Sequence, residues 1–289
     1  MAQKSIHIIS QTGSDFPFDE AQRLGVELIP DIVRFGEIEY KDRVELDCAE
    51  FYKKLSAMQE LPTSSHPSLG TFMQSFKRAA ESGASAIICI LVTSRMSGSC
   101  STALTAVNAL KQGGFDVPVY VYDSEQCSHG TSQLIRLAAE MAAEGLDAAY
   151  IIKRLDDFKP RSGFYFMLDS LKNARKGGRV GAIKALTADM LGIKPMLCFE
   201  KGMCVDFAIA RSFSEGIKRI TDIVKREADF RRPVTVFHAG APEKAELICS
   251  HILAFEPGAI IRKEYVGPVI GIYAGPGASG LAFTKRTGL

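Results

Sequence analysis

Two spacings of apolar residues alternate along the first half of the chain, and each predicts one kind of element. Four short apolar runs predict strands, at residues 6–9, 26–29, 85–92 and 117–122. The run at 85–92 is nearly continuous, which is typical of a strand covered on both faces of its sheet. Helical spacing of apolar residues follows at residues 47–58, 67–76, 97–110 and 130–144. Strands and helices that alternate in this order favour a parallel, doubly wound sheet.

The second half has a different pattern, with more aromatic residues and a different order of elements. Apolar runs predict strands at residues 164–167, 195–199, 203–210, 234–238, 259–265 and 269–273. Helices are predicted at residues 182–190, 213–230 and 242–255. With a boundary near Pro160, the fold class is α/β with two domains. Residues 1–160 are expected to form a three-layer α/β/α domain with a parallel sheet, and residues 161–289 an α/β domain with a mixed or antiparallel sheet.

Composition and charge exclude several classes of protein. The apolar fraction of 46% and the charged fraction of 24% are ordinary for a soluble globular protein. A net charge of +2 argues against a nucleic-acid partner. No apolar run is long enough to cross a bilayer, no signal peptide is evident, and the seven cysteines include no C-x-x-C pair. We therefore expect a cytoplasmic protein with no stable membrane insertion.

A polar turn at residues 94–99 is the first candidate site, because it follows the buried strand at 85–92 and precedes a helix. In an open α/β sheet, ligands bind at this end of the strands. The small residues Ser97 and Gly98, with the free N–H groups of a helix start, would suit an anion. The alternative is that Ser97 only caps the helix.

Further candidates lie in three other segments. The loop at residues 63–68 is rich in hydroxyl groups and includes Ser64, although such a loop can also be an ordinary polar turn. Arg211 follows a strand and could pair with a carboxylate, although a solvated arginine is the alternative. The Gly-Pro-Gly segment at residues 275–277 would form a tight turn, with a structural role as the alternative.

Residues that often carry catalysis or metals do not form a familiar pattern. Asp15 and Asp123 each follow a strand, but neither has a second carboxylate at metal-binding spacing. The five histidines, at positions 7, 66, 129, 238 and 251, show no H-x-x-x-H or H-E-x-x-H spacing. The nucleophile-elbow, dinucleotide-binding and P-loop motifs are also missing from the sequence. The sequence therefore contains no recognisable machinery for nucleophilic, hydride or nucleotide chemistry, and we expect no catalytic residue and no metal site.

Seven segments, in the same order along the chain, resemble motifs of the DegV family. In the first half, residues 10–17 resemble the family's T-D-S-T-A-D-L-P, residues 64–68 its T-S-Q-P-S, residues 96–99 its L-S-G-T and residues 121–124 its V-x-D-S. In the second half, residues 170–179 resemble its Y-L-x-x-G-G-R region, residues 192–195 its L-x-I-K-P and residues 275–278 its H-T-G-P-G-A. Together these segments span almost the whole chain.

The resemblance implies a protein that binds a long-chain fatty acid and does no chemistry itself. Members of the family present the fatty acid to a separate fatty acid kinase, which phosphorylates its carboxylate for phospholipid synthesis. The family's carboxylate-binding positions fall on Ser64, Ser97 and Arg211, and we add Gly98 and Tyr273 to the expected ligand-binding set. The acyl chain is expected in an apolar slot between the two domains. No cofactor other than the bound fatty acid is implied.

Two departures from the family pattern bear on function. Tyr273 stands where the family has a histidine before Gly-Pro-Gly, and its hydroxyl stays neutral at pH 7. Gln11 and Thr12 stand at the family's T-D-S, so that an acidic side chain is lost.

One alternative function is a small-molecule enzyme or kinase subunit related to dihydroxyacetone kinases, acting through Asp123, Asp15 or a histidine. Another is a regulatory or assembly module with a vestigial pocket.

Overall fold

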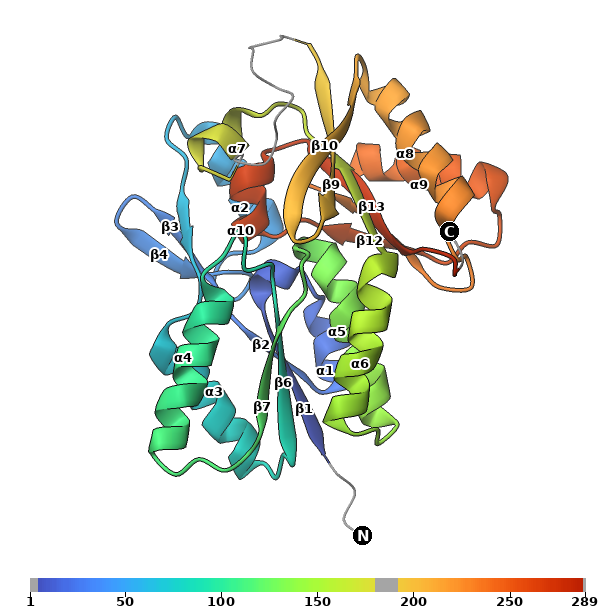
Figure 1. Cartoon of the computed structure of the whole chain (residues 1–289). Helices are drawn as coiled ribbons and strands as arrows, with labels where there is room; N and C mark the ends of the chain where they lie inside the picture. Colours follow the sequence, from blue (N-terminus) through green and yellow to red (C-terminus); the bar gives the residue numbers. More distant parts are fainter. Residues whose placement is uncertain (1–4, 180–191, 288–289) are drawn as a thin grey trace. The chain divides into compact units, whose positions relative to one another are not determined.

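A computed structural model describes residues 5–179 and 192–287, and the chain divides into two compact units (Figure 1). The first unit consists of residues 1–32 and 65–160, and the second of residues 33–64 and 161–289. The chain thus passes between the units after residues 32, 64 and 160. The segment 33–64, expected within the N-terminal domain, belongs to the second unit. The helix predicted at residues 182–190 lies outside the described residues.

The first unit contains the parallel sheet that the alternating pattern predicts. Its strand order is β2-β1-β6-β7, and every neighbouring pair is parallel. The bounds are β1 (Ile6–Gln11), β2 (Val26–Ile29), β6 (Ala86–Leu91) and β7 (Val119–Asp123). All six residues of β6 are buried, because this central strand is covered on both faces.

Helices cover both faces of this sheet, so the first unit has three layers, as the sequence predicts (Figure 1). On one face Ile8 and Ile88 pack against α1, α5 and α6, and on the other Ile9 and Ile87 pack against α3 and α4. The bounds are α1 (Phe18–Leu24), α3 (Leu69–Glu81), α4 (Ser99–Gln112), α5 (Ser128–Ala143) and α6 (Ala148–Phe158).

The second unit is built on a six-stranded mixed sheet with the order β10-β9-β8-β13-β11-β12. Only the pair β11 and β12 is parallel among these strands, and the others are antiparallel. The strands are β8 (Ser162–Met167), β9 (Lys194–Glu200), β10 (Met203–Ala210), β11 (Val234–His238), β12 (Ile261–Tyr265) and β13 (Ser279–Thr284). The expected mixed or antiparallel sheet is therefore confirmed.

The two faces of this sheet differ in composition. Helices α8 (Phe213–Glu227) and α9 (Pro242–Phe255) pack on one face, where they meet Tyr165 and Met167 of β8. Side chains alternate along a strand, so Phe164 and Phe166 point to the opposite face. There they join Phe199 and Phe237, with ring centroids 5.2–6.4 Å apart in the neighbouring pairs. We call these four residues the phenylalanine face.

A smaller group of elements completes the second unit. A three-stranded sheet has the order β4-β3-β5. The helices α2 and α10 of this unit pack against each other. The bounds are β3 (Ile32–Phe35), β4 (Ile38–Lys41), α2 (Cys48–Ala57), β5 (Thr63–Ser65), α7 (Lys172–Lys176) and α10 (Pro268–Ala274). The Tyr52 hydroxyl on α2 donates a hydrogen bond to the Val266 carbonyl at 2.8 Å. This bond ties the segment 33–64 to the C-terminal half of the chain.

The strand predicted at residues 269–273 is wrong, because these residues lie in helix α10. Four apolar residues around one glycine fit a strand or a buried helix turn equally well. Pro268 decides between them, since its fixed φ suits the first position of a helix and its missing N–H is not needed there. Gly271 then lets the helix approach closely, because a Cβ there would lie 2.5 Å from the Tyr52 hydroxyl oxygen and 2.8 Å from Phe51.

Candidate functional site

The turn before α4 places two of the expected site residues together. The Ser97 side chain is half-buried, and its oxygen lies 2.7 Å from the Ser99 hydroxyl oxygen. The Ser99 backbone N–H also donates to the Ser97 oxygen at 3.2 Å. Gly98 occupies the N-cap position, so the helix begins two residues after Ser97. Ser97 is therefore not the N-cap residue; it lies one position before it and places a hydroxyl pair, half-buried at Ser97 and fully buried at Ser99, beside the first turn of the helix.

Ser64 and Tyr273 meet within the second unit. Their hydroxyl oxygens lie 2.8 Å apart, and both side chains are half-buried. The Arg179 guanidinium stacks over the Tyr273 ring at 4.8 Å from its centre, which is a cation–π geometry. Gly177 lies against the same ring, and a Cβ there would overlap it. The Gly-Gly-Arg segment thus holds the Tyr273 ring from one side.

The end of α10 is held by a network of charged groups. Lys244 donates to the Gly277 carbonyl at 2.8 Å and pairs with the Asp169 carboxylate at 2.8 Å. Lys194 pairs with the same Asp169 oxygen at 3.2 Å. Gly275 and Gly277 have φ values of +76° and +82°, which favour glycine. The Gly-Pro-Gly turn therefore needs both glycines and is fixed in place just after Tyr273.

Arg211 lies on an exposed turn between β10 and α8. Its backbone N–H donates to the Glu215 carboxylate at 2.8 Å, and Ser212 caps the helix by accepting from the Glu215 N–H at 3.1 Å. Arg219, one turn further along the helix, forms an ion pair with Glu215. Within residues 5–179 and 192–287, the Arg211 guanidinium makes no hydrogen bond or ion pair. The pKa of the Glu215 carboxyl is lowered, first by this backbone hydrogen bond and further by the charges of Arg219 and Arg211, so the exposed Arg211 side chain lies near a carboxylate without an ion pair.

His66 is a residue that sequence reasoning missed, because its neighbours are distant along the chain. Its ring lies against Gly98, where a Cβ would come within 2.9 Å of Cε1. Its Nε2 lies 2.9 Å from the Thr102 hydroxyl oxygen. The signal available in the sequence was the histidine itself, which stands where the family motif has glutamine.

The carboxylates of Asp123 and Asp15, which were considered as catalytic candidates, accept hydrogen bonds from groups of the first unit. Asp123 accepts from the N–H groups of Ser94 at 3.2 Å and Glu125 at 2.9 Å, so it joins the turns that follow β6 and β7. Asp15 is buried with a φ of 53° and accepts a short hydrogen bond from the Ser128 hydroxyl. Both carboxylates are engaged by donors within the first unit.

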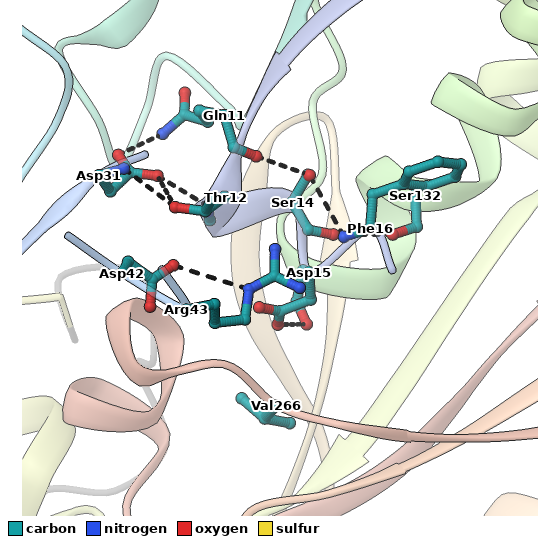
Figure 2. Close-up of polar contacts among 12 residues, drawn as sticks. Gln11, Thr12, Ser14, Asp15, Phe16, Asp31, Asp42, Arg43, Ser132 and Val266 are labelled. Atoms are coloured by element: carbon teal, nitrogen blue, oxygen red, sulfur yellow. Dashed lines mark hydrogen bonds and ion pairs between the residues drawn. The ribbon is translucent and has the colours of Figure 1, made fainter. Parts of the chain in front are cut away.

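Gln11 and Thr12, which replace the family's acidic segment, bind a different carboxylate. Figure 2 shows both side chains pointing at the buried Asp31. The Asp31 carboxylate accepts from Gln11 Nε2 at 2.8 Å, from the Thr12 hydroxyl at 3.2 Å and from the Gly13 N–H at 2.7 Å. The substituted residues therefore complete a buried polar network directly before the chain leaves the first unit.

His238 and Cys100 are buried, and burial shifts the pKa of both side chains. Burial lowers the pKa of His238, with a weaker opposing effect from Glu243, and its Nδ1 accepts from the Ala241 N–H at 3.2 Å. Burial, with a smaller contribution from the Asp123 charge, raises the pKa of the Cys100 thiol to about 12. The imidazole therefore stays neutral, and the thiol is not a thiolate nucleophile.

In the described part of the chain, no three histidine, cysteine or acidic side chains lie together as metal ligands. No described helix is both long enough and apolar enough to cross a membrane.

Comparison with known proteins gives one consistent family. The model of the DegV family, a family of uncharacterised proteins, matches residues 5–286. A DegV domain-containing protein of Halalkalibacterium halodurans is 34% identical over 265 residues, which cover 91% of this chain and 92% of that protein. The DegV protein of Bacillus subtilis is 29% identical over 282 residues, which cover 96% of this chain and 99% of that protein.

Solved structures agree with this result. The crystal structure of Bacillus subtilis DegV, described as a fatty acid binding protein, matches with a TM-score of 0.88 and 29% identity, over 98% of this chain and all of that one. A DegV family protein of Thermus thermophilus, whose structure is described in terms of fatty acid binding, has a TM-score of 0.87 and 24% identity, over 97% and 99% of the two chains. The second likeness shows the shared fold.

Proposed function

Because this chain belongs to the DegV family, we propose that it binds a long-chain fatty acid through the carboxylate and presents it to a fatty acid kinase for phospholipid synthesis. The observation that carries the proposal is the likeness, over nearly the whole chain, to a Bacillus subtilis protein described as fatty-acid-binding. The reaction on the carboxylate belongs to the kinase. We place this activity in the cytoplasm, where the seven free thiols would stay reduced.

Two hydroxyl pairs support the carboxylate part of the proposal. A pair of hydroxyl groups contains two hydrogens, and only one of them is used in the bond between the two oxygens. The pair Ser64–Tyr273 therefore keeps one O–H to donate, and the pair Ser97–Ser99 keeps another. Burying a carboxylate without such donors would cost several kcal/mol. Gly98 adds the N-terminal end of α4, where N–H groups and the helix dipole favour an anion.

Arg211 would supply the positive charge that a carboxylate needs. Its guanidinium makes no ion pair within the described residues, whereas Arg219 beside it is paired with Glu215. A guanidinium offers two parallel N–H donors that match the two oxygens of a carboxylate. An exposed arginine that forms no ion pair within the described residues, on a turn fixed by its backbone hydrogen bond, is thus a suitable counter-charge for a fatty acid.

The phenylalanine face would hold part of the acyl chain. Phe164 and Phe237 are almost fully buried, and Phe166 and Phe199 are half-buried beside them. The four rings form one apolar cluster within one sheet, and Phe166 and Phe199 carry its accessible part. Each CH2 group removed from water contributes roughly 0.8 kcal/mol, so a long chain could bind tightly without a covalent bond.

Mass spectrometry of the bound ligand tests the proposal directly. Protein purified from cells would be analysed under native conditions and again after denaturing extraction. We expect a fatty acid in the extract and a native mass that exceeds the chain by that amount. An extract free of fatty acid, together with failure of the delipidated protein to bind oleate, would refute the proposal. ATP turnover by this chain alone on a small polyol would instead support the kinase-subunit alternative.

A further inference from the structure

His66 lies at the start of α4, beside the proposed carboxylate site. Its ring packs on Gly98, with Cε1 2.9 Å, Nε2 3.4 Å and Nδ1 3.6 Å from the position of a Cβ at residue 98. Its Nε2 lies 2.9 Å from the Thr102 hydroxyl oxygen, one turn further along α4. The imidazole therefore spans the first turn of the helix whose N-terminus carries Ser97.

One ring nitrogen of His66 is used and the other is not. Nε2 is taken by Thr102, and Nδ1 has no hydrogen-bond partner within the part of the chain that the structure describes. The Thr102 hydroxyl can donate to Nε2, and the proton of the neutral ring then sits on Nδ1. In that tautomer Nδ1–H is a donor on the ring whose Cε1 lies against Gly98.

The lack of a side chain at Gly98 leaves room for this ring. Its φ of −75° and ψ of −1° are open to residues with a side chain, so the backbone does not require glycine there. A Cβ, however, would press on Cε1 at 2.9 Å, which real Cβ contacts essentially never show. The absence of a side chain at residue 98 thus lets the imidazole lie close to the helix start.

Covalent geometry also keeps His66 close to Ser64. Two residues of extended chain span at most about 7 Å, so the Cα of His66 lies within that distance of the Cα of Ser64. Ser64 in turn bonds to Tyr273, which stands where the family has its histidine. The chain therefore has a phenol at the family's histidine position and an imidazole on the hydroxyl-rich segment.

We propose that His66 is a further ligand-binding residue, which donates from Nδ1–H to the carboxylate of the fatty acid beside Ser97 and Gly98. The proposal rests on the proposed function. It gives the site a nitrogen donor that neither the family motifs nor the comparisons assign. Glutamine, the residue of the family motif at this position, also carries an N–H donor.

Binding of oleate to delipidated protein at pH 7.5 tests the assignment. His66→Phe keeps a planar ring but removes both nitrogens, and we expect oleate affinity to fall about tenfold. His66→Gln restores an N–H donor and should bind within about threefold of the original protein. His251→Phe, a histidine of α9 in the second unit, is the matched control and should change nothing.

The outcomes separate this proposal from the proposed function. If the original chain binds no oleate, the proposed function fails. If it binds oleate and His66→Phe binds equally well, only the role of His66 is overturned. Equal losses in the Phe and Gln variants would also overturn it, because they would indicate a packing role. Should His66→Phe not fold, the 15N shifts of His66 in the original protein decide, and an Nδ1 signal unchanged by oleate refutes the contact.

Discussion

Replacing Asp31 should destabilise the first unit strongly, because at least three buried donors converge on its carboxylate. Asp31 is 1% exposed, and its partners Gln11 and Thr12 are equally inaccessible (Figure 2). Gln11 Nε2 approaches one carboxylate oxygen at 2.8 Å, while the Thr12 hydroxyl and the Gly13 N–H approach the other at 3.2 and 2.7 Å. A buried donor left without a partner costs about 1–3 kcal/mol. Allowing for some relaxation, we expect Asp31→Ala to lower the free energy of unfolding by about 4 kcal/mol.

Asp31→Asn should lower the free energy of unfolding by less than Asp31→Ala, because the amide can keep part of the hydrogen-bond network. The Asn carbonyl oxygen can replace the oxygen that accepts from Thr12 and Gly13. Its NH2 group would then face Gln11 Nε2, another donor. Gln11 can turn its amide over, since its own Oε1 has no hydrogen-bond partner within the described residues. The expected loss is therefore about 1–2 kcal/mol, mainly from the lost charge.

Urea unfolding followed by circular dichroism measures both values, since the chain has no tryptophan to report by fluorescence. Hydrogen exchange of the β1 amides would assign the loss to the first unit. Asp157→Ala is the control, because Asp157 is exposed and pairs only loosely with Arg154, at 3.6 Å. If Asp31→Ala unfolds within about 0.5 kcal/mol of the original protein, the network does not stabilise the fold as we argue.

Three further predictions concern ligand charge, pH and packing. Arg211→Ala should weaken oleate binding at least tenfold without changing the free energy of unfolding, and Ser97→Ala should weaken binding several-fold. Arg219→Ala is the control and should leave the affinity for oleate unchanged. Equal oleate affinities for Arg211→Ala and Arg219→Ala would contradict the assignment of Arg211 to the site. Because burial lowers the pKa of His238, the unfolded state binds more protons below pH 6.5, so stability should fall as pH drops from 6.5. His238→Gln should flatten that slope in unfolding curves measured across this range, and an unchanged slope would count against the assignment. Gly271→Ala should cost about 2 kcal/mol of unfolding free energy, because its Cβ meets the Tyr52 hydroxyl at 2.5 Å; a neutral result in urea would show that α10 can shift freely.

The elements that the sequence predicts well are those whose local pattern has a single physical reading. The apolar run at residues 85–92 fits a covered strand between polar turns, and the structure has β6 at Ala86–Leu91. Residues 269–273 had two readings, and Pro268 favoured the helix that formed. The strand β13 was missed because its S-G-L-A-F-T sequence alternates weakly, and it is placed by its neighbours β8 and β11.

The candidate site shows the same division between local and long-range information. The Ser97 turn is a local feature, since strand, polar turn and helix follow one another in the chain. The pairing of Ser64 with Tyr273 joins residues 209 positions apart, and the packing of His66 on Gly98 joins residues 32 positions apart. No periodicity encodes such contacts, because they depend on how whole elements pack. The family motifs pointed to Ser64, Ser97 and Tyr273. The contacts of His66, which departs from its motif, were found only in the structure.

The position of β13 has a consequence for the synthesis of this protein. β13 lies between β8 and β11 in the six-stranded sheet, yet it follows both of them along the chain. During synthesis on the ribosome, the six-stranded sheet therefore lacks its strand between β8 and β11 until residues 279–284 emerge. Until then β8 and β11 each have an unpaired strand edge exposed to other chains, which is a state prone to aggregation. Nascent chains paused or cut before Ser279 should accordingly be strong clients of chaperones and unable to retain a lipid.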